Sequence, residues 1–392
     1  MQPQSNQNIR VLRILNRFNV GGPVWNVALL TKYLPEEYET KLIGGKATPN
    51  EADAQYILSE FNINASVIPS LSREVSLGND LKAFLALRKM IKEFKPHLVH
   101  THASKAGFLG RLAAITTGVP IVVHTYHGHV FEGYFGPMKT RIIKELERFL
   151  ARKSTAIVTI SQAQKKAITE KYKICHAEKT HVIPLGFALE RFYPSPAKRN
   201  QARITYDLND DIIAVGIVGR LTAVKNHSLF LKAAAILLSH STLNYQFFVV
   251  GDGETKAELQ QLCAEYGITS KVSFTSWIHS MEKFYPAMDI ICLTSFNEGT
   301  PVSLIEAQAS GIPVISTNVG GVENTMIGNE TGFILTSFFP QELAKKIDSL
   351  ANAPELRIQM SKNAHTFATE QFSYHALVNN MDALYKKLLN DA

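Results

Sequence analysis

Residues 295–314 read Ser295-Phe-Asn-Glu-Gly-Thr-Pro-Val-Ser-Leu-Ile-Glu-Ala-Gln-Ala-Ser-Gly-Ile-Pro-Val314 and follow an apolar run at 289–293. The apolar run predicts a buried parallel strand. Pro301 fits the first turn of a helix, because the N–H that proline lacks has no partner there. Gly311 and Pro313 then predict the end of the helix, just before a second apolar run. The pattern is that of a strand, a helix and another strand in an open α/β sheet.

Two carboxylates, Glu298 and Glu306, bracket the N-terminus of this predicted helix. Open α/β sheets bind their ligands at the carboxyl ends of the strands, where this helix begins. Free N–H groups at a helix N-terminus attract phosphate, whereas carboxylates accept hydrogen bonds from sugar hydroxyls. The combination indicates a ligand that has both phosphate and hydroxyl groups, which is a nucleotide sugar.

The length of 392 residues predicts two domains, and 45% hydrophobic with 19% charged residues is typical of a soluble globular protein. No apolar run reaches the length of about 18 residues that spans a membrane. The polar first eight residues lack the apolar centre of a signal peptide. Three cysteines, Cys175, Cys263 and Cys292, have no metal-binding spacing. They fit a reducing cytosol, with Cys292 in a strand of the core.

The charge is distributed unevenly along the chain. Residues 1–185 contain 25 Lys and Arg against 14 Asp and Glu, a net charge of +11. Residues 186–392 contain 16 against 20, a net charge of −4, so that the whole chain carries +7. A basic first half indicates an anionic partner, which is a nucleic acid, a membrane surface or a phosphorylated substrate.

Two strand ends in the first half carry candidate ligand-binding residues. Gly21 and Gly22 follow the first predicted strand, and they either let backbone approach a ligand or form a tight turn into the next helix. His102 and Lys105 follow a later strand and would face the same ligand site. Alternatively, they belong to a helix cap and a solvated surface.

The segment 125–136 is rich in His, Gly and aromatic residues, which is typical of functional loops. His124, His127 and His129 have the residue type of zinc ligands, but no cysteine or suitably spaced carboxylate completes a set. We predict instead that His127 is presented to a ligand as an acid, a base or a hydrogen-bond partner.

The second half repeats the alternation of strands and helices. Arg220 and Lys225 follow a predicted strand and suit a diphosphate, which arginine can bind through two parallel hydrogen bonds. The segment 251–254 resembles a dinucleotide-binding turn, but Lys256 stands where the third glycine would be, so a nicotinamide enzyme is not expected. Backbone at the strand end near Trp277 is suited to reading a base.

Together, these motifs resemble glycosyltransferase family 4, a retaining group with the GT-B fold that includes bacterial exopolysaccharide and O-antigen enzymes. The most specific feature is the acid pair with seven residues between its members, and the resemblance covers nearly the whole chain. The resemblance implies an α/β protein with two Rossmann-like domains facing across a cleft. Residues 1–185 would bind the acceptor and residues 186–371 the nucleotide sugar, and a helix at 372–392 would cross back onto the first domain.

The resemblance also implies a role for each candidate residue. Glu298 would contact the transferred sugar and His127 would lie near the reacting anomeric carbon, both as catalytic residues. Glu306 would bind the ribose. The donor diphosphate would lie against Gly22, Arg220 and Lys225, the sugar against Gly299, Thr300, Pro301 and Val302, the base against Trp277 and Ile278, and the acceptor near His102 and Lys105.

No Asp-x-Asp motif is present, so we expect no metal or other cofactor and assign neutralisation of the diphosphate to the cations and helix N–H groups. We expect retaining transfer from a nucleotide-diphosphate sugar, with UDP favoured by family frequency, to a lipid-linked acceptor. The basic half would attach peripherally to the anionic inner face of the cytoplasmic membrane. Alternatives are a soluble acceptor, a UDP-sugar 2-epimerase and a nucleic-acid-binding protein. The last is disfavoured because no nucleic-acid-binding motif appears.

Overall fold

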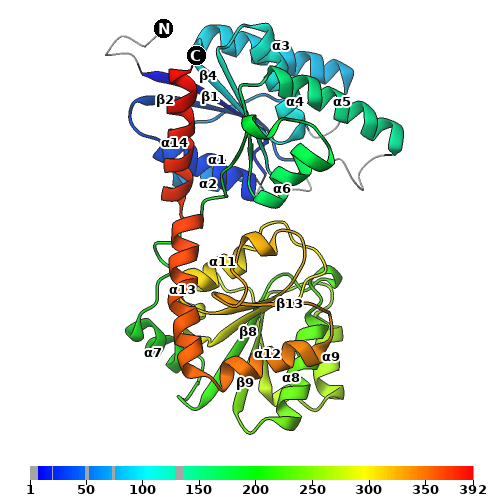
Figure 1. Ribbon diagram of the computed structural model, residues 1–392, viewed down its shortest axis with the longest axis vertical. Coiled ribbons are helices and arrows are strands. Elements are labelled where there is room, and N and C mark those ends of the chain that lie inside the picture. The colour runs from blue at the N-terminus through cyan, green and yellow to red at the C-terminus, as the bar shows by residue number, and fades with distance from the viewer. Residues whose placement is uncertain (1–7, 20, 49–52, 73–75, 129–135, 392) are drawn as a thin grey trace. The chain divides into compact units, whose positions relative to one another are not determined.

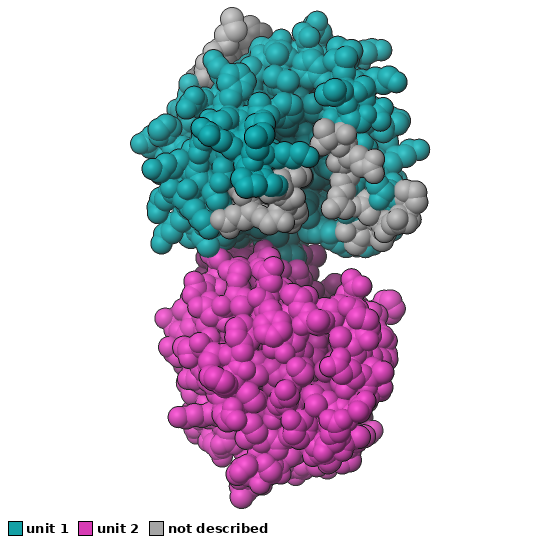
Figure 2. Space-filling view, turned by 90° about the vertical axis from the view of Figure 1, so that its right-hand side faces the viewer, with its two compact units in different colours: residues 1–187, 374–392 teal, residues 188–373 magenta. Residues whose placement is uncertain are grey.

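The computed structural model describes residues 8–19, 21–48, 53–72, 76–128 and 136–391. The chain forms two compact units, which Figure 2 shows in different colours. Unit 1 comprises residues 1–187 and 374–392, and unit 2 comprises residues 188–373. Both divisions fall two residues after the boundaries that the sequence suggests. Each unit contains one parallel sheet with its own helices (Figure 1).

The sheet of unit 1 has the order β3-β2-β1-β4-β5-β6-β7. Every neighbouring pair is parallel, so the carboxyl ends of these strands share one edge. The strands are β1 (Ile9–Arg17), β2 (Tyr38–Gly45), β3 (Ser66–Val67), β4 (Leu98–His102), β5 (Ile121–Tyr126), β6 (Ala156–Thr159) and β7 (Thr180–Val182).

Both faces of this sheet are covered, because alternate side chains of β1 enter different cores. Val11 and Leu15 pack with helices α1, α2 and α14, whereas Leu12 and Ile14 pack with α3 and α4. The C-terminal helix α14 is therefore part of the core of unit 1. The helices of this unit are α1 (Gly22–Tyr33), α2 (Gln55–Glu60), α3 (Leu77–Phe94), α4 (Ser104–Thr116), α5 (Pro137–Lys153), α6 (Gln162–Lys166) and α14 (Tyr374–Asn390).

The sheet of unit 2 has the order β10-β9-β8-β11-β12-β13 and is also parallel throughout. Its strands are β8 (Ile212–Val218), β9 (Asn244–Val250), β10 (Val272–Ser276), β11 (Ile290–Leu293), β12 (Val314–Thr317) and β13 (Gly332–Leu335). Its helices are α7 (Pro196–Thr205), α8 (His227–His240), α9 (Lys256–Glu265), α10 (Met281–Phe284), α11 (Val302–Ala309), α12 (Pro340–Ala351) and α13 (Pro354–Phe372).

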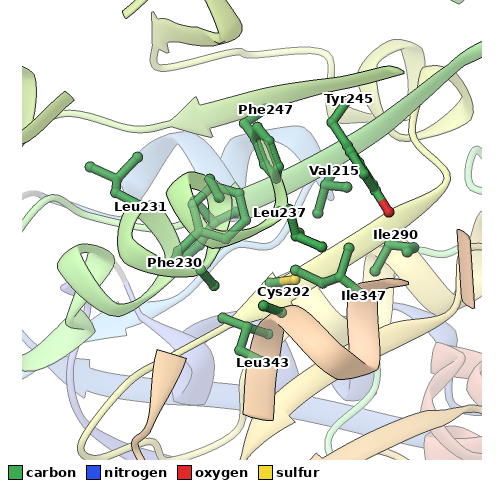
Figure 3. Close-up of a cluster of buried hydrophobic side chains, with 14 of the residues drawn as sticks. Val215, Phe230, Leu231, Leu237, Tyr245, Phe247, Ile290, Cys292, Leu343 and Ile347 are labelled. Carbon is green, nitrogen blue, oxygen red and sulfur yellow. The ribbon is translucent and has the colours of Figure 1, made fainter. Parts of the chain in front are cut away.

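One core of unit 2 lies between the sheet and helices α8 and α12 (Figure 3). Phe247 of β9 packs edge-on against Phe230 of α8, with ring centroids 5.7 Å apart. Cys292 of β11 is 1% exposed within this cluster, which confirms its prediction as a core residue.

The stretch 295–314 has the predicted local structure, because β11, α11 and β12 follow one another and β11 pairs with β12 in parallel. The helix begins one residue later than predicted. Pro301 is the N-cap with an extended backbone, and Val302 is the first helical residue. Gly311 ends the helical segment with a left-handed φ of 76°, a conformation that glycine adopts without strain.

Candidate functional site

A pocket of about 370 Å³ lies in unit 2 among the loops that follow strands β8, β10 and β11. Among the predicted site residues, Arg220 does not line the pocket, although its neighbour Gly219 does, and the Arg220 side chain is exposed. Gly299 likewise lies beside a lining residue. The predicted residues that line the pocket are Lys225, Trp277, Ile278, Glu298, Thr300, Pro301, Val302 and Glu306.

A larger hollow of about 690 Å³ also occurs in unit 2, lined by parts of α7 and α13 and by residues 310–313, which precede β12. It therefore lies at the amino ends of the strands, away from Glu298 and Glu306. In open α/β sheets ligands bind at the carboxyl ends, so the smaller pocket is the candidate site.

Hydrogen bonds between loops hold the pocket together. Gly219 N–H donates to the Val250 carbonyl over 3.0 Å, which joins the loops after β8 and β9. Phe296 N–H donates to the Val224 carbonyl over 2.8 Å, which joins the loops after β11 and β8. These bonds pair backbone groups of different loops, and the joined loops frame the side chains that line the pocket.

The loop after β12 packs directly against the backbone of the Glu298 loop. Gly321 N–H donates to the Glu298 carbonyl over 3.2 Å. A Cβ atom on Gly320 would lie 1.9 Å from the Glu298 carbonyl oxygen, and one on Gly321 would lie 1.9 Å from that of Gly299. Only glycine allows so close an approach, and this contact fixes the path of the Glu298 loop.

Lys225 and Glu298 form an ion pair at the pocket wall. The Lys225 Nζ atom lies 2.6 Å from Glu298 Oε1, and Ser295 Oγ donates to the same oxygen over 2.5 Å. The Glu298 side chain is 8% exposed and that of Lys225 is 26% exposed. The sequence did not indicate Ser295 as a partner, although a hydroxyl three residues before a carboxylate in a loop is within reach of it.

Glu306 lies on the first turns of α11, and its environment favours the protonated form. Burial raises the pKa of its carboxyl to about 7, although the nearby charge of Arg191 and a hydrogen bond from Tyr285 act in the opposite direction. Tyr285 Oη donates to Glu306 Oε2 over 3.3 Å. Hydroxyl groups that donate to this carboxyl would favour its ionised form, because they stabilise negative charge.

In unit 1, four histidines gather where β4 and β5 end. His102 Nδ1 lies 3.0 Å from His127 Nε2, and His124 Nδ1 lies 2.8 Å from Thr101 Oγ1. Burial lowers the pKa of each imidazole, that of His127 to about 4. All four are therefore neutral near pH 7 and act as hydrogen-bonding groups. They are His100, His102, His124 and His127.

The zinc alternative gains no support from the described part of the chain, in which no group of three His, Cys, Asp or Glu residues could hold a metal ion. His129 lies outside the described residues. Gly107 of α4 packs on His124, since a Cβ atom there would lie 2.3 Å from the imidazole. His124 is thus enclosed by α4 rather than presented to a ligand.

The remaining candidates of unit 1 differ in their surroundings. Gly22 is exposed and is the first residue of α1, where a Cβ atom would meet only Leu185 at 3.8 Å. Lys105 Nζ lies 2.5 Å from Asp80 Oδ1 of α3, in an ion pair whose two side chains are mostly buried. An anionic ligand at Lys105 would therefore compete with Asp80. His102 is completely buried.

We predict that Gly321→Ala destabilises unit 2 by roughly 1–3 kcal/mol, because the added Cβ pushes the two loops apart. Hydrogen–deuterium exchange of β11 and β12 under native conditions would measure the change. Gly299→Ala is the control, since nothing lies within 4 Å of its Cβ position, and it should change stability by less than about 0.5 kcal/mol. Equal protection in the two variants would contradict the packing role of Gly321.

We predict that Glu306→Gln stabilises unit 2 increasingly as the pH rises from 5 to 7. The pKa of the folded carboxyl is raised to about 7, so stability that is present at low pH is lost as the pH rises through that value. The glutamine variant avoids this loss, which amounts to roughly 1–3 kcal/mol and levels off above pH 7.

Urea unfolding of unit 2, measured by hydrogen exchange at several pH values, tests this expectation. Glu342→Gln is the matched control of opposite sign. Burial acts to raise the pKa of Glu342, but hydrogen bonds from Ser337 and Thr336 together outweigh it and lower that pKa. That variant should be less stable than the wild type at neutral pH, and the difference in the free energy of unfolding should disappear in acid. A Glu306→Gln effect that does not change with pH would show that burial does not disfavour the charged carboxylate.

Two family models cover most of the chain: "Glycosyltransferase Family 4" matches residues 20–191 and "Glycosyl transferases group 1" matches residues 198–367. The chain is 30% identical over 329 residues to the UDP-Gal:alpha-D-GlcNAc-diphosphoundecaprenol alpha-1,3-galactosyltransferase of Escherichia coli, covering 83% of this chain and 84% of that protein. It is 28% identical over 350 residues to the capsular polysaccharide biosynthesis glycosyltransferase CapM of Staphylococcus aureus, covering 87% of this chain and 90% of that protein.

Solved structures have the same fold at lower identity. A glycosyltransferase from Rickettsia africae ESF-5 superimposes with a TM-score of 0.81 at 21% identity, covering 99% of this chain and all of that one. Anabaena Alr3699/HepE, solved in complex with UDP, also gives 0.81, at 20% identity and with coverage of 96% and 100%. The chain therefore belongs to glycosyltransferase family 4 and is a glycosyltransferase with the GT-B fold, whose two Rossmann-like domains are units 1 and 2.

Proposed function

We propose that this enzyme transfers a sugar from a UDP-sugar to a lipid-linked acceptor in the synthesis of a bacterial polysaccharide, O-antigen or glycolipid, with retention of the anomeric configuration. The observation that carries the proposal is the pocket of unit 2, in which a cation and two carboxylates lie around the start of α11. The Escherichia coli relative is named for UDP-Gal and for a diphosphoundecaprenol acceptor, which supports both the donor and the acceptor.

The lining of the pocket suggests the order in which it binds the parts of the donor. Trp277 and Ile278 offer an apolar wall and backbone groups to the base, and Glu306 offers a carboxylate to the ribose hydroxyls. Lys225 and the exposed Arg220 bind the diphosphate. Glu298 and residues 299–302 then contact the sugar, where the N–H groups at the start of α11 add positive potential.

Glu298 orients the sugar and does not attack it. One of its oxygens already accepts hydrogen bonds from Lys225 and Ser295, which holds the carboxylate in place and reduces its nucleophilicity. In the proposed step, the acceptor hydroxyl oxygen bonds to the anomeric carbon on the face from which the diphosphate leaves. The hydroxyl proton passes to the leaving phosphate oxygen. Lys225 and Arg220 supply the positive charge that stabilises this oxygen, so the step needs no metal.

A soluble acceptor is the second candidate, because another relative is named D-inositol 3-phosphate glycosyltransferase. That protein, from Rhodococcus erythropolis, is 29% identical over 347 residues and covers 83% of this chain and 76% of its own length. Transfer assays with lipid extracts and with phosphorylated soluble alcohols would distinguish the two acceptor classes.

We predict that Glu298→Ala lowers transfer at least 100-fold, a loss of about 3 kcal/mol in transition-state stabilisation. UDP binding should survive with less than about threefold change, because the variant keeps Lys225 and frees it from its carboxylate partner. Radiolabelled transfer and calorimetry with UDP measure the two effects. Glu254→Ala, which removes an exposed carboxylate from the loop after β9, is the control and should leave both unchanged. Near-normal transfer by Glu298→Ala would refute the assignment.

Unit 1 is proposed to attach peripherally to an anionic membrane through α5. Spacings of four, four and three residues place Met138, Ile142, Leu146 and Phe149 on one face of this helix. Their side chains are between 42% and 78% exposed, whereas Glu147, Leu150 and Ala151 are buried against the unit. An apolar stripe turned toward solvent is typical of a helix that lies in the membrane interface.

Cations border the apolar stripe on both sides. By helical spacing, Arg141 and Arg152 lie on one side of it and Lys139 lies on the other, while Lys153 follows the stripe at the C-terminal end of the helix. All four are exposed. Each such cation contributes about 1 kcal/mol at an anionic surface. In the described residues, no helix is both long and apolar enough to cross a membrane. The proposed location is the cytoplasmic face of the inner membrane, and we propose no nucleic-acid partner.

We predict that the enzyme floats with vesicles that contain phosphatidylglycerol and not with pure phosphatidylcholine vesicles. The double variant Ile142→Ser, Phe149→Ser should bind at least fivefold less, because it loses two apolar contacts of roughly 1 kcal/mol or more each. The control is Ile204→Ser, Ile358→Ser, which removes two exposed isoleucines from unit 2. If the α5 variant floats like the wild type, or if the control fails equally, the α5 surface is not the membrane contact.

A further inference from the structure

The C-terminal helix α14 contacts the histidine cluster through Tyr385. The Tyr385 side chain is completely buried, and its Oη atom lies 2.5 Å from Nδ1 of His100, which precedes it by 285 residues. Arg13 donates to the same Oη over 3.4 Å, so the tyrosine hydroxyl proton is directed to His100. On its other side, His100 Nε2 lies 2.7 Å from Thr125 Oγ1. Both nitrogens of His100 are thus held.

The contacts continue from His100 to His127. His100 and His102 lie two residues apart on β4, so their side chains are on the same face, and their ring centroids are 4.2 Å apart. His102 Nδ1 then meets His127 Nε2 at 3.0 Å, with the two rings stacked at 5.3 Å. Tyr385, His100, His102 and His127 therefore form one continuous series of contacts.

The unpartnered nitrogens indicate where the protons lie. His102 Nε2 and His127 Nδ1 are buried, and neither has a hydrogen-bond partner among the described residues. His102 Nδ1 and His127 Nε2 share one hydrogen bond, so one of the two rings must carry its other proton on a nitrogen without a partner. His102 is completely buried whereas His127 is only partly buried, so the unpartnered N–H falls on His127, where a substrate oxygen can accept it, and His102 keeps its proton on Nδ1. His102 then donates to His127 Nε2, and the single proton of neutral His127 lies on Nδ1.

We propose that His102 is a positioning residue, held by His100 and by Tyr385 of α14, that keeps His127 as the Nδ1–H tautomer. His127 then offers a hydrogen-bond donor to an oxygen of the substrate and does not act as a general base, since the free nitrogen already carries a proton. This inference rests on the proposed sugar transfer for its substrate, but the tautomer itself is a property of unit 1 alone.

Nitrogen-15 NMR of histidine-labelled enzyme reads the tautomer of His127 directly, with His127→Gln used for assignment. The wild type should show Nδ1 protonated and Nε2 accepting a hydrogen bond. In His102→Leu this signature should change to a mixture of tautomers, because the donor to Nε2 is gone. His102→Asn keeps an N–H near the position of Nδ1 and should preserve the signature. His124→Leu is the matched control, since it removes another buried histidine, whose Nδ1 contacts Thr101 Oγ1 and not the His102–His127 pair.

Kinetics supply the second readout. His102→Leu should lower kcat at least tenfold with less than threefold change in KM for the UDP-sugar, and His102→Asn should restore most of the loss. Tyr385→Phe should lower kcat two- to fivefold. A wild-type spectrum with the proton on Nε2, or a His102→Leu spectrum equal to wild type, would overturn the inference. If His127 carries its proton on Nδ1 but the enzyme transfers no sugar, the proposed function is wrong and the positioning role of His102 is retained.

Discussion

Parallel pairing of every strand brings the carboxyl ends of each sheet to a single edge, and all the candidate functional groups depend on that arrangement. In unit 2 it gathers loops that are far apart in the sequence into a pocket framed by backbone hydrogen bonds. In unit 1 it places histidines from β4 and β5 side by side. A parallel sheet must be buried on both faces, so the edge is the place where polar side chains can gather without cost to the core.

The charged side chains of the unit 2 pocket are partly neutralised by neighbouring protein groups. Lys225 forms an ion pair with Glu298. Burial raises the pKa of the Glu306 carboxyl, and the charge of Arg191 and the hydrogen bond from Tyr285 offset part of that increase. The proposed donor would satisfy both sites, because its diphosphate brings negative charge to the lysine and its hydroxyls bring hydrogen-bond donors to the carboxylates. On the proposed function, the pocket is thus prearranged for phosphate and sugar groups, and such prearranged dipoles and charges need little reorganisation during a reaction.

Local sequence signals predicted much of the fold. The apolar runs around residues 295–314, together with Gly311 and Pro313, predicted β11, α11 and β12, because strand burial and helix termination depend on neighbouring residues. The same reasoning placed Cys292 in the core. It also selected Lys225, Glu298 and Glu306, which line the pocket, since any loop that follows a parallel strand ends at the shared edge. The resemblance to glycosyltransferase family 4 added Thr300, Pro301 and Val302.

Contacts between distant side chains could not be predicted in this way. Lys225 and Glu298 are 73 residues apart, and the sequence assigned them to separate parts of a ligand rather than to each other. Lys105 had no visible relation to Asp80, which reaches it from another helix. His102 was expected to face a ligand or to belong to a helix cap. The alternation along β4 shows that His100 and His102 share a face of the strand, but it does not show that Tyr385 of α14 contacts that face at His100.

The position of α14 has a consequence for the order in which the protein folds during synthesis. Unit 2 is encoded by one continuous segment, residues 188–373, whereas unit 1 requires residues from both ends of the chain. Leu377, Met381 and Tyr385 of α14 are part of the same core as β1 and α1. The ribosome must therefore complete unit 2 before unit 1 receives its last helix. Until then the emerging chain carries an open apolar face, which is the kind of surface that chaperones bind.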